Sequence, residues 1–538
     1  MTNETADSND SRLVTSSVFL TIAFLAGAGT MLVEVLAPRI MQPYFGASTF
    51  VWTNVIGVIL LAMALGYNLG GKLAEKGPGS TRIAWTLSFA ALLTLFAKIA
   101  FPALAEFLLP SAEALADSAD ARSRLQTGSL VAAICLFCPP VFLLATLTPQ
   151  IIQEVVRNGA SVGRASGRVF MWGTLGSLVG TFLPTYWLVP QFGTLISFFI
   201  AAGLLFLPAA ILFGTNHKAK VASCIFAVLS VVVLGSASSS GPIREVLEGE
   251  ELLFEAESRY QYLRLVKKPA VEDPSIQETK LCLDEGLLDF HSVDTHGRVG
   301  TLGKYYDYFA ILPTLFSPDR KLKILVLGSG MGTMSKMLCA FWPEQIGRIV
   351  DVEIDPAVIK LAASMAREHG ETQDKRIESV AMDARAYAQV TNEKFDLILV
   401  DAYARQVDIP FHMTTVEFFE MLSQRLVSNG IVALNVSAKD PEAALTKSIL
   451  RSMATGGLRG LHSTWIRYWG NRMLWGGSNR VSVALTKIDV PKELQSVQEH
   501  ALRVQRAAPI DDGAVLLTDD HAPVEELTRR SLIKGETK

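Results

Sequence analysis

Cysteine and histidine are scarce in this sequence, which holds 5 cysteines and 8 histidines in 538 residues. Cys135 and Cys138 are spaced C-x-x-C, but no histidine or second cysteine pair accompanies them, and both lie in an apolar stretch. Structural zinc sites take four ligands, and a disulfide framework needs a larger set of spaced cysteines. We therefore expect the cysteines to pack as small apolar residues, and we predict no metal site.

The sequence also lacks an excess of charge of either sign. It has 49 Lys and Arg against 52 Asp and Glu, for a net charge of −3. Nucleic-acid-binding proteins usually carry a strongly basic face, and this balance gives no such field. Charged residues make up 19% of the chain and hydrophobic residues 50%, with a mean hydropathy of +0.31. This composition indicates a membrane-embedded part.

Seven stretches in the first half are long and apolar enough to cross a membrane. A spanning helix needs about 20 apolar residues. The stretches lie at 14–36, 50–71, 83–109, 128–148, 169–190, 194–213 and 219–237. Glycines at helical spacing in "LGYNLGGKLA" and "WGTLGSLVG" are typical of closely packed helices. We therefore predict a transmembrane helical domain over residues 1–240.

The second half of the chain has the patterns of a soluble domain. "LLFEAESRYQYLRLVKK" and "TKLCLDEGLLDFHS" alternate apolar and polar residues, which predicts a small antiparallel β domain over residues 241–310. Beyond it, strands such as "KILVLG", "RIVDVEI", "FDLILVD", "GIVALNV", "STWIRYW" and "RVSVALT" are separated by helical patterns. This alternation predicts a doubly wound parallel sheet, in a Rossmann-like domain over residues 311–538.

A glycine-rich loop follows the first of these strands, in "ILVLGSGMGTMSKML". Gly328, Gly330 and Gly332 lie between a buried strand and a helix, where backbone can approach a nucleotide-like ligand closely. Met331 stands in the middle of the loop.

Acidic residues follow three successive strands after the glycine loop. They are Glu353 with Asp355 beyond it, Asp383, and Asp401. Ligands of such sheets bind at the carboxyl ends of the strands, and the first acid after a glycine loop commonly binds a ribose. The alternative is that these acids only cap the helices that follow them, as "IDP" suggests for Asp355.

Taken together, these motifs resemble the spermidine synthase family of polyamine aminopropyltransferases. The motifs "ESRYQYL", "LCLDEGLLD", "YYDYFAILP", "LGSGMG", "VEIDP", "MDAR" and "LVDAY" match it in order. The stretches "EVLAPRIMQPYFGASTFVW", "LGYNLGGKLA" and "LTDDHAPVEEL" resemble its bacterial integral-membrane branch. The resemblance implies the class I methyltransferase-like fold, a transferase of the EC 2.5.1 type, and S-adenosylmethionine or its decarboxylated form as substrate.

The resemblance also implies roles for single residues. Glu353 would bind the ribose and Asp383, with Ala384, the adenine. Asp401 would take the proton from an attacking amine. Gln261, Tyr305 and Tyr306 would border the aminopropyl or amine site.

Two positions depart from the family pattern. The family has an acid where this chain has Met331, and that acid holds the amine of the aminopropyl donor. A second acid, which helps to hold the acceptor, is replaced by Ala404 or Arg405, with Asp408 further along. A methionine cannot accept a charged hydrogen bond. We therefore hypothesise that the loop holds adenosine but offers no acid to the amine of an aminopropyl tail, and that the donor is S-adenosylmethionine itself or another sulfonium nucleoside.

Three functions follow from these observations. The first is a membrane-anchored, spermidine synthase-like enzyme that transfers an alkyl group, or displaces it within one molecule, and releases methylthioadenosine. The second is a methyltransferase, since the same sheet serves that chemistry. The third is a transporter that senses adenosyl compounds or polyamines, supported by Glu34 at membrane depth. The expected partners are a small amine or adenosyl molecule and the lipid bilayer, and a homodimer is among the allowed assemblies.

The orientation in the membrane presents a conflict. The positive-inside rule places the N-terminus and the basic links of the helical domain in the cytoplasm. Seven crossings would then put the soluble half outside, where an adenosyl substrate is not expected. We therefore expect one stretch not to cross, with 219–237 the weakest because it runs into "GSASSS". This places the soluble half on the cytoplasmic side of the inner membrane.

Overall fold

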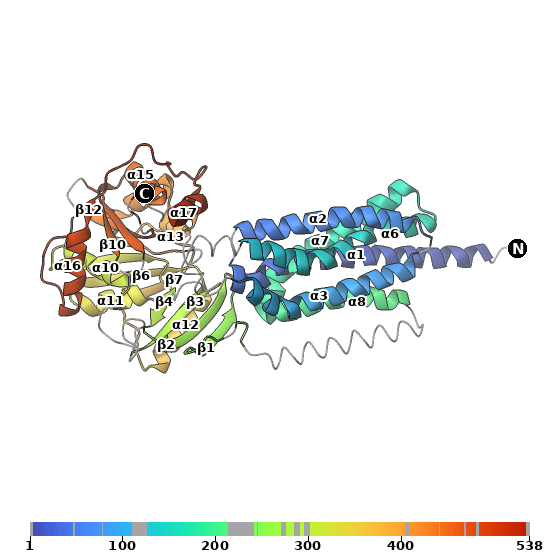
Figure 1. Cartoon of the computed structure of the whole chain (residues 1–538), viewed down its shortest axis with the longest axis horizontal. Coiled ribbons are helices and arrows are strands. Elements are labelled where there is room, and N and C mark those ends of the chain that lie inside the picture. The colour runs from blue at the N-terminus through green and yellow to red at the C-terminus, as the bar shows by residue number, and fades with distance from the viewer. Residues whose placement is uncertain are drawn as a thin grey trace. The chain divides into compact units, whose positions relative to one another are not determined.

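A computed structural model of the chain forms two compact units, Met1–Val246 and Leu247–Lys538 (Figure 1). The structure describes residues 4–46, 49–77, 79–109, 126–213, 242–244, 246–270, 276–284, 291–294, 302–403, 409–438, 440, 442–466, 470–479 and 484–533. Each unit is considered by itself below.

The first unit is helical. Its elements are α1 (Glu4–Phe45), α2 (Thr49–Ala74), α3 (Ser80–Leu108), η1 (Ala133–Phe137), α6 (Cys138–Arg157), α7 (Val162–Leu183), η2 (Pro184–Leu188) and α8 (Val189–Phe213). Among the described residues, 5 helices are long and apolar enough to span a membrane: Ser16–Phe45, Phe50–Ala74, Ser80–Leu108, Gln126–Arg157 and Val162–Leu212. The first four correspond to the first four predicted spans. The stretch 219–237 lies outside the described residues.

Glycines allow the helices of this unit to approach closely, as predicted. A Cβ at Gly176 of α7 would lie 1.9 Å from the carbonyl oxygen of Phe24, and one at Gly180 would lie 2.2 Å from that of Ala28, both in α1. Any side chain there would force the two backbones apart. Because the contact positions advance together along both helices, α7 runs parallel to α1.

The fifth apolar helix contains two of the predicted spans. Its 51 residues are interrupted at Gly193, whose φ of 74° and ψ of 172° are not helical. Beyond the break, Leu205 packs against Gly29, and Ala201 packs with Leu32. The contact positions now advance in opposite directions, so α8 is antiparallel to α1 and hence to α7. A helix of this length would extend about 75 Å, more than twice the ~30 Å of a bilayer core. The segment is therefore a helical hairpin that can cross twice.

The second unit begins with a four-stranded antiparallel sheet, in the order β1-β2-β3-β4. The strands are β1 (Glu251–Glu257), β2 (Tyr262–Pro269), β3 (Gln277–Leu283) and β4 (Ser292–Asp294). Leu263 and Leu265 of β2 and Leu281 of β3 bury one face of this sheet. The predicted alternation of apolar and polar residues therefore forms the small β unit.

An eight-stranded sheet follows, in the order β12-β10-β11-β9-β8-β5-β6-β7. Its strands are β5 (Leu322–Leu327), β6 (Ile346–Glu353), β7 (Ile377–Ala381), β8 (Phe395–Val400), β9 (Leu426–Ser437), β10 (Arg459–Ile466), β11 (Asn471–Gly477) and β12 (Arg506–Ala507). Strands β5 to β9 pair in parallel, whereas β10, β11 and β12 pair antiparallel. The sheet is therefore mixed, which corrects the prediction of a wholly parallel sheet. A second prediction, of a strand near the C-terminal end of the sheet, is also corrected. The strand expected in "RVSVALT" is not a strand at 484–486, and 480–483 lie outside the described residues.

Helices cover both faces of the sheet. They are α10 (Tyr306–Ala310), α11 (Thr333–Phe341), α12 (Pro356–Glu368), α13 (Ala384–Val390), α14 (Val416–Gln424), α15 (Ala444–Thr455), α16 (Gln495–Val504) and α17 (Val524–Ile533), with the short turns η3 (Leu312–Leu315), η4 (Phe411–Met413) and η5 (Lys492–Leu494). One apolar core joins the sheet to α14, α15 and α17, and a second joins it to α10, α11 and α16. The chain order reverses between β5 and β8, and such a switch point is where ligands bind.

Candidate active site

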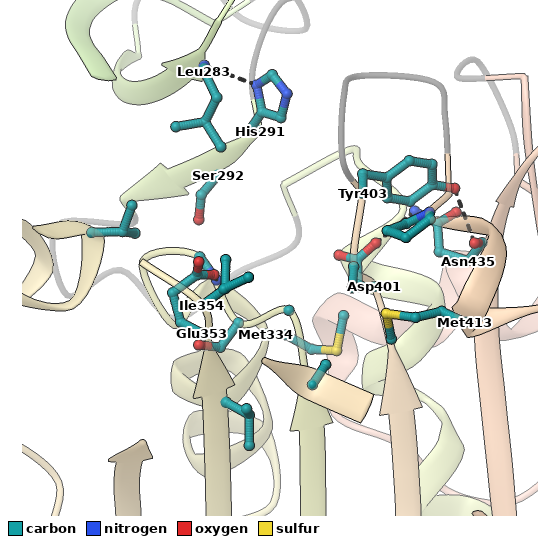
Figure 2. A pocket seen from close by; sticks show the side chains of 18 of the residues that line it. Leu283, His291, Ser292, Met334, Glu353, Ile354, Asp401, Tyr403, Met413 and Asn435 are labelled. Carbon is teal, nitrogen blue, oxygen red and sulfur yellow. Dashed lines mark hydrogen bonds between the residues drawn. The ribbon is translucent and has the colours of Figure 1, made fainter. Parts of the chain in front are cut away.

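A cavity of about 340 Å³ opens at the carboxyl ends of β5, β6 and β8 (Figure 2). Its walls include nine of the eleven predicted site residues, and these are Gln261, Tyr305, Tyr306, Gly328, Gly330, Glu353, Asp383, Ala384 and Asp401. Figure 2 shows Glu353 and Asp401 at the ends of separate strands, with Met334 between them. The sequence therefore identified most of the residues that meet here.

The glycine loop is shaped by close backbone contact. Gly328 has a φ of 86°, and a Cβ there would lie 2.6 Å from the Cα of Ala402. Only glycine adopts this conformation without strain and also permits that approach. As a result, the loop after β5 and the segment after β8 touch, and both face the cavity.

Glu353 holds the glycine loop from the end of β6. Its Oε2 accepts a hydrogen bond from the Gly330 amide at 3.0 Å, and its Oε1 accepts one from the Asp355 amide at 3.1 Å. The side chain is only 8% exposed. Burial raises the pKa of Glu353, while these amide donors oppose the rise.

Asp355 and Asp383 both cap helices, so the capping interpretation is right for them. Asp355 accepts from the Ala357 amide at 2.9 Å, and its other oxygen accepts from the Ser258 hydroxyl at 2.6 Å. Asp383 accepts from the Ala386 amide at 2.9 Å. Asp383 also lines the cavity, whereas Asp355 does not. Capping and ligand binding are therefore compatible at Asp383.

Asp401 is the most distinctive acid of the cavity. Its Oδ1 accepts a hydrogen bond from Asn435 Nδ2 at 2.9 Å, and Asn435 Oδ1 in turn accepts from Asn471 Nδ2 at 2.9 Å. Burial raises the pKa of Asp401 to about 7, although hydrogen bonds from Asn435 and Tyr305 oppose the rise. A base with a pKa near neutrality suits proton transfer at physiological pH.

Two tyrosine rings lie beside Asp401. The ring centroids of Tyr305 and Tyr306 are 4.2 Å apart, and the Tyr306 hydroxyl donates to the carbonyl oxygen of His291 at 3.1 Å. Burial, followed by the charge of Asp401, raises the pKa of both phenols, so both stay protonated at neutral pH. They provide aromatic faces on which a cation is stabilised.

The cavity is acidic and has no cationic counterpart among its described lining residues. Glu353, Asp383 and Asp401 supply carboxyl groups, whereas no lysine or arginine contributes to its wall in the described part of the chain. Burial lowers the pKa of His291 to about 3, and its Nδ1 accepts from the Leu283 amide at 3.1 Å, so this histidine is neutral. The electrostatics favour a positively charged ligand.

Met331 and Gly332 are the two predicted site residues that do not line this cavity. Gly332 begins α11 with a φ of 76°. The Met331 side chain is 3% exposed and packs with Leu263, Leu281 and Val358. Its amide donates to the Ser292 hydroxyl at 3.0 Å. The methionine side chain therefore fills an apolar core that it shares with the small β unit.

The sequence did not identify several residues of the wall. These are His291, Ser292, Met334, Tyr403, His412, Met413, Asn435 and Asn471. Asn435 could have been recognised as a candidate site residue, because it is a polar residue inside the apolar strand "GIVALNV". Asn471 could not have been recognised in this way, since the strand that holds it was not predicted. Arg405 and Asp408 lie outside the described residues. Trp475 is fully buried and does not line this cavity.

Comparison with known proteins gives similarities over most of the chain. Residues 304–457 match the profile of the spermine/spermidine synthase domain. A probable polyamine aminopropyl transferase of Bifidobacterium longum is 28% identical over 337 residues, which are 59% of this chain and 71% of that protein. Polyamine aminopropyltransferase 2 of Aquifex aeolicus is 24% identical over 462 residues, 82% of this chain and 84% of that protein.

One similarity to a solved structure is with a probable spermidine synthase from Corynebacterium glutamicum. It is 18% identical, covers 50% of this chain and 97% of that one, and has a TM-score of 0.36.

Proposed function

We infer that this chain, whose residues 304–457 match the spermine/spermidine synthase domain, transfers an aminopropyl group from decarboxylated S-adenosylmethionine to an amine. The family match over residues 304–457 and the aminopropyltransferase relatives confirm the resemblance and the transferase class. The mixed α/β domain preceded by a small antiparallel sheet agrees with the fold class expected for the soluble half.

The observation that carries the proposal is the charge of the cavity. A sulfonium donor and an amine acceptor are both cationic, and the described wall offers three carboxyl groups and no lysine or arginine. The carboxylate of intact S-adenosylmethionine finds no cationic partner in this wall. The decarboxylated donor lacks that group and suits the cavity better.

Asp401 acts as the base in the proposed reaction. Its carboxylate accepts a proton from the acceptor amine, whose nitrogen lone pair then attacks the carbon bound to sulfur. The C–S bond breaks, its electron pair stays on sulfur, and neutral methylthioadenosine leaves. Tyr305 and Tyr306 flank Asp401 and shield the cationic groups from water, which keeps the attacking nitrogen aligned.

The adenosyl part of the donor is proposed to lie between the glycine loop and β6. Glu353 would bind the ribose hydroxyls, and Asp383 with Ala384 would contact the adenine. Gln261 faces the same space from the small β unit, and its Nε2 donates to Asp355 at 3.3 Å. Gly328 and Gly330 leave room for the nucleoside because they carry no side chain.

A second candidate follows from Met331. A methionine has no carboxylate that could bind the amine of an aminopropyl tail. Its side chain is also turned into an apolar core. Intramolecular displacement in S-adenosylmethionine itself, by its own amine or carboxylate, also releases methylthioadenosine and needs no such acid at position 331. It requires only the adenosyl site and a group that aligns the tail.

We propose that the helical unit anchors the enzyme in the inner membrane, with the soluble unit in the cytoplasm. The five long apolar helices support anchoring. The lipid bilayer would then be a partner of the first unit, and the assembly state, a homodimer included, is open to measurement. Glu34, the basis of the transporter alternative, does not line the 240 Å³ cavity of the helical unit.

Product identification by mass spectrometry tests the proposal. Purified protein in detergent is incubated with S-adenosylmethionine or with its decarboxylated form, each with and without putrescine. Methylthioadenosine and spermidine from the decarboxylated donor alone would support aminopropyl transfer. Methylthioadenosine from S-adenosylmethionine without an acceptor would support the second candidate. S-adenosylhomocysteine would show a methyltransferase, and no product from either donor would overturn the enzyme proposal.

A further inference from the structure

Arg472 is a buried cation that has no acidic partner among the described residues. It lies on β11, and only 4% of it is exposed. Its Nη1 donates to the Ser463 hydroxyl at 3.4 Å, and its Nε has no hydrogen-bond partner. Among the described residues, no carboxylate forms an ion pair with its guanidinium group. A guanidinium that is out of water and unpaired is costly, so a ligand that pairs with it would be bound favourably.

This guanidinium lines a second cavity, of about 760 Å³. The cavity lies over β10, β11 and β12 near α15, and it is walled by Ser463, Trp465, Leu450 and Arg506 among others. Trp465 stands directly opposite Arg472 in the β10–β11 pairing. Ser463 pairs with Arg506 in the β10–β12 pairing. Strand register therefore brings both guanidinium groups and the Ser463 hydroxyl to one face of the sheet.

The described wall of this cavity carries three acids, Glu442, Asp511 and Asp512, and three bases, Lys447, Arg472 and Arg506. Lys447 forms an ion pair with Glu442 at 2.7 Å and with Asp511 at 3.4 Å. Arg506, by contrast, donates only to the backbone carbonyl groups of Arg503 and Gln505. Burial lowers the pKa of Arg472, and the more distant Asp440 and Glu442 only partly oppose this effect. Asp512 is the remaining acid of the wall. The wall as a whole is therefore neutral, but among the described residues its ion pairs involve Lys447 and neither arginine.

We propose that this cavity binds a small oxyanion, a carboxylate or a phosphate, between Arg472 and Arg506. The planar guanidinium group presents paired N–H donors to two oxygens of such an anion, and the Ser463 hydroxyl adds a third donor. The site is distinct from the acidic cavity. Asn471 lines the acidic cavity, whereas its neighbour Arg472 lines this one, because successive side chains of a strand point to opposite faces. The proposal does not depend on the enzymatic reaction.

Thermal unfolding of the full-length protein in detergent tests this site. Sodium phosphate, disodium succinate and sodium chloride are titrated at matched ionic strength. We expect phosphate or succinate, but not chloride, to raise the unfolding temperature saturably. The anion that does so identifies the ligand class. Equal effects of all three salts would overturn the proposal.

Variants then locate the effect. Arg472→Gln is expected to weaken the apparent affinity for the stabilising anion at least about tenfold, since a charged hydrogen-bond donor is lost. Arg506→Gln is expected to weaken the affinity for this anion several-fold. Arg506 is exposed, so its replacement leaves the core intact, and this variant tests the site if Arg472→Gln does not fold. Arg503→Gln removes an exposed arginine that does not line the cavity and is the matched control. An anion response unchanged in both Arg506→Gln and Arg472→Gln would contradict the assignment.

Discussion

At the scale of single residues, the buried carboxyl group of Asp401 links structure to chemistry. Its environment opposes ionisation, so the group is poised near neutrality and can accept and return a proton. Glu353 is buried too, but two backbone amides hold it, which suits a fixed binding role. The two acids, at the ends of β6 and β8 on either side of β5, thus differ in their hydrogen-bond partners, and we propose different roles for them.

The raised pKa of Asp401 predicts a pH dependence. The base must be ionised to accept a proton, so kcat/KM is expected to rise with pH through about 7 and to level off above it. Measuring kcat/KM from pH 5.5 to 9 checks this, and a rate that falls across the same range would contradict the assignment of Asp401 as base.

The position of Met331 leads to a prediction about stability. Met331→Asp would place a carboxylate among Leu263, Leu281 and Val358, and we expect it to lower the free energy of unfolding by roughly 3–5 kcal/mol. Met331→Leu keeps the volume and should cost less than about 1.5 kcal/mol. Chemical denaturation measures both. A stable Met331→Asp protein with tighter donor binding would show that the side chain at 331 reaches the donor after all.

Residue types and spacing predicted most of the acidic cavity but not its surroundings. Gly328, Glu353, Asp383 and Asp401 could be found because each follows a strand whose apolar run is readable. Asn471 and Ser292 could not, since they reach the cavity from the antiparallel strand β11 and from a separate sheet. The orientation of the Met331 side chain could not be predicted either, because the sequence does not reveal which way a loop side chain turns. That direction is decided by the packing of the small β unit.

At the scale of elements, the turn from β5 to α11 positions the glycine loop against the end of β8. The contact between Gly328 and Ala402 fixes the separation of the adenosyl region from Asp401. The small β unit contributes Gln261 and Ser292 to the same cavity, so the site depends on both sheets.

Gly328→Ala is expected to disturb this turn. The added Cβ would meet backbone atoms at 2.6 Å, and the φ of 86° is unfavourable for alanine. We expect a loss of several kcal/mol in stability and a large rise in the KM for the donor. Gly370→Ala is the matched control, because Gly370 has a φ of 67° but open space around it, and should cost only about 1 kcal/mol. Equal effects of the two changes would refute the steric argument.

Element boundaries were only partly predictable. The two predicted stretches 169–190 and 194–213 are arms of one broken helix, and only Gly193 marked the break. The antiparallel strand β11 was missed because "NRMLWGG" begins with polar residues and ends in glycines, which is a poor strand signal. Its place is set by pairing with β9 and β10, a non-local effect.

At the scale of the whole molecule, the helical unit bears on the membrane orientation. Its described part offers four single crossings and a hairpin, and six crossings return the chain to the side of the N-terminus. The basic links near Lys76 and Arg157 then lie on that same side, in keeping with the positive-inside rule.

This orientation can be tested with reporter fusions. If 219–237 does not cross, green fluorescent protein fused to the C-terminus will fluoresce and alkaline phosphatase fused there will be inactive. A fusion after residue 215 should behave in the same way and serves as the internal control. An active C-terminal phosphatase together with an inactive one at 215 would show instead that 219–237 crosses the membrane.

The central claim is that Asp401 is the base of an acidic cavity, and one paired measurement on Asp401→Asn tests it most directly. Methylthioadenosine formation and thermal unfolding are measured on the same sample at pH 8, beside the control Asp319→Asn at an exposed residue. Because burial raises the folded-state pKa of Asp401 from 3.8 to about 7, the folded state loses stability as the pH rises between these two values, and this loss is complete at pH 8. We predict a loss of at least about 100-fold in turnover with an unfolding temperature equal to or above that of the unmodified protein. Turnover within threefold of the unmodified protein would contradict the account.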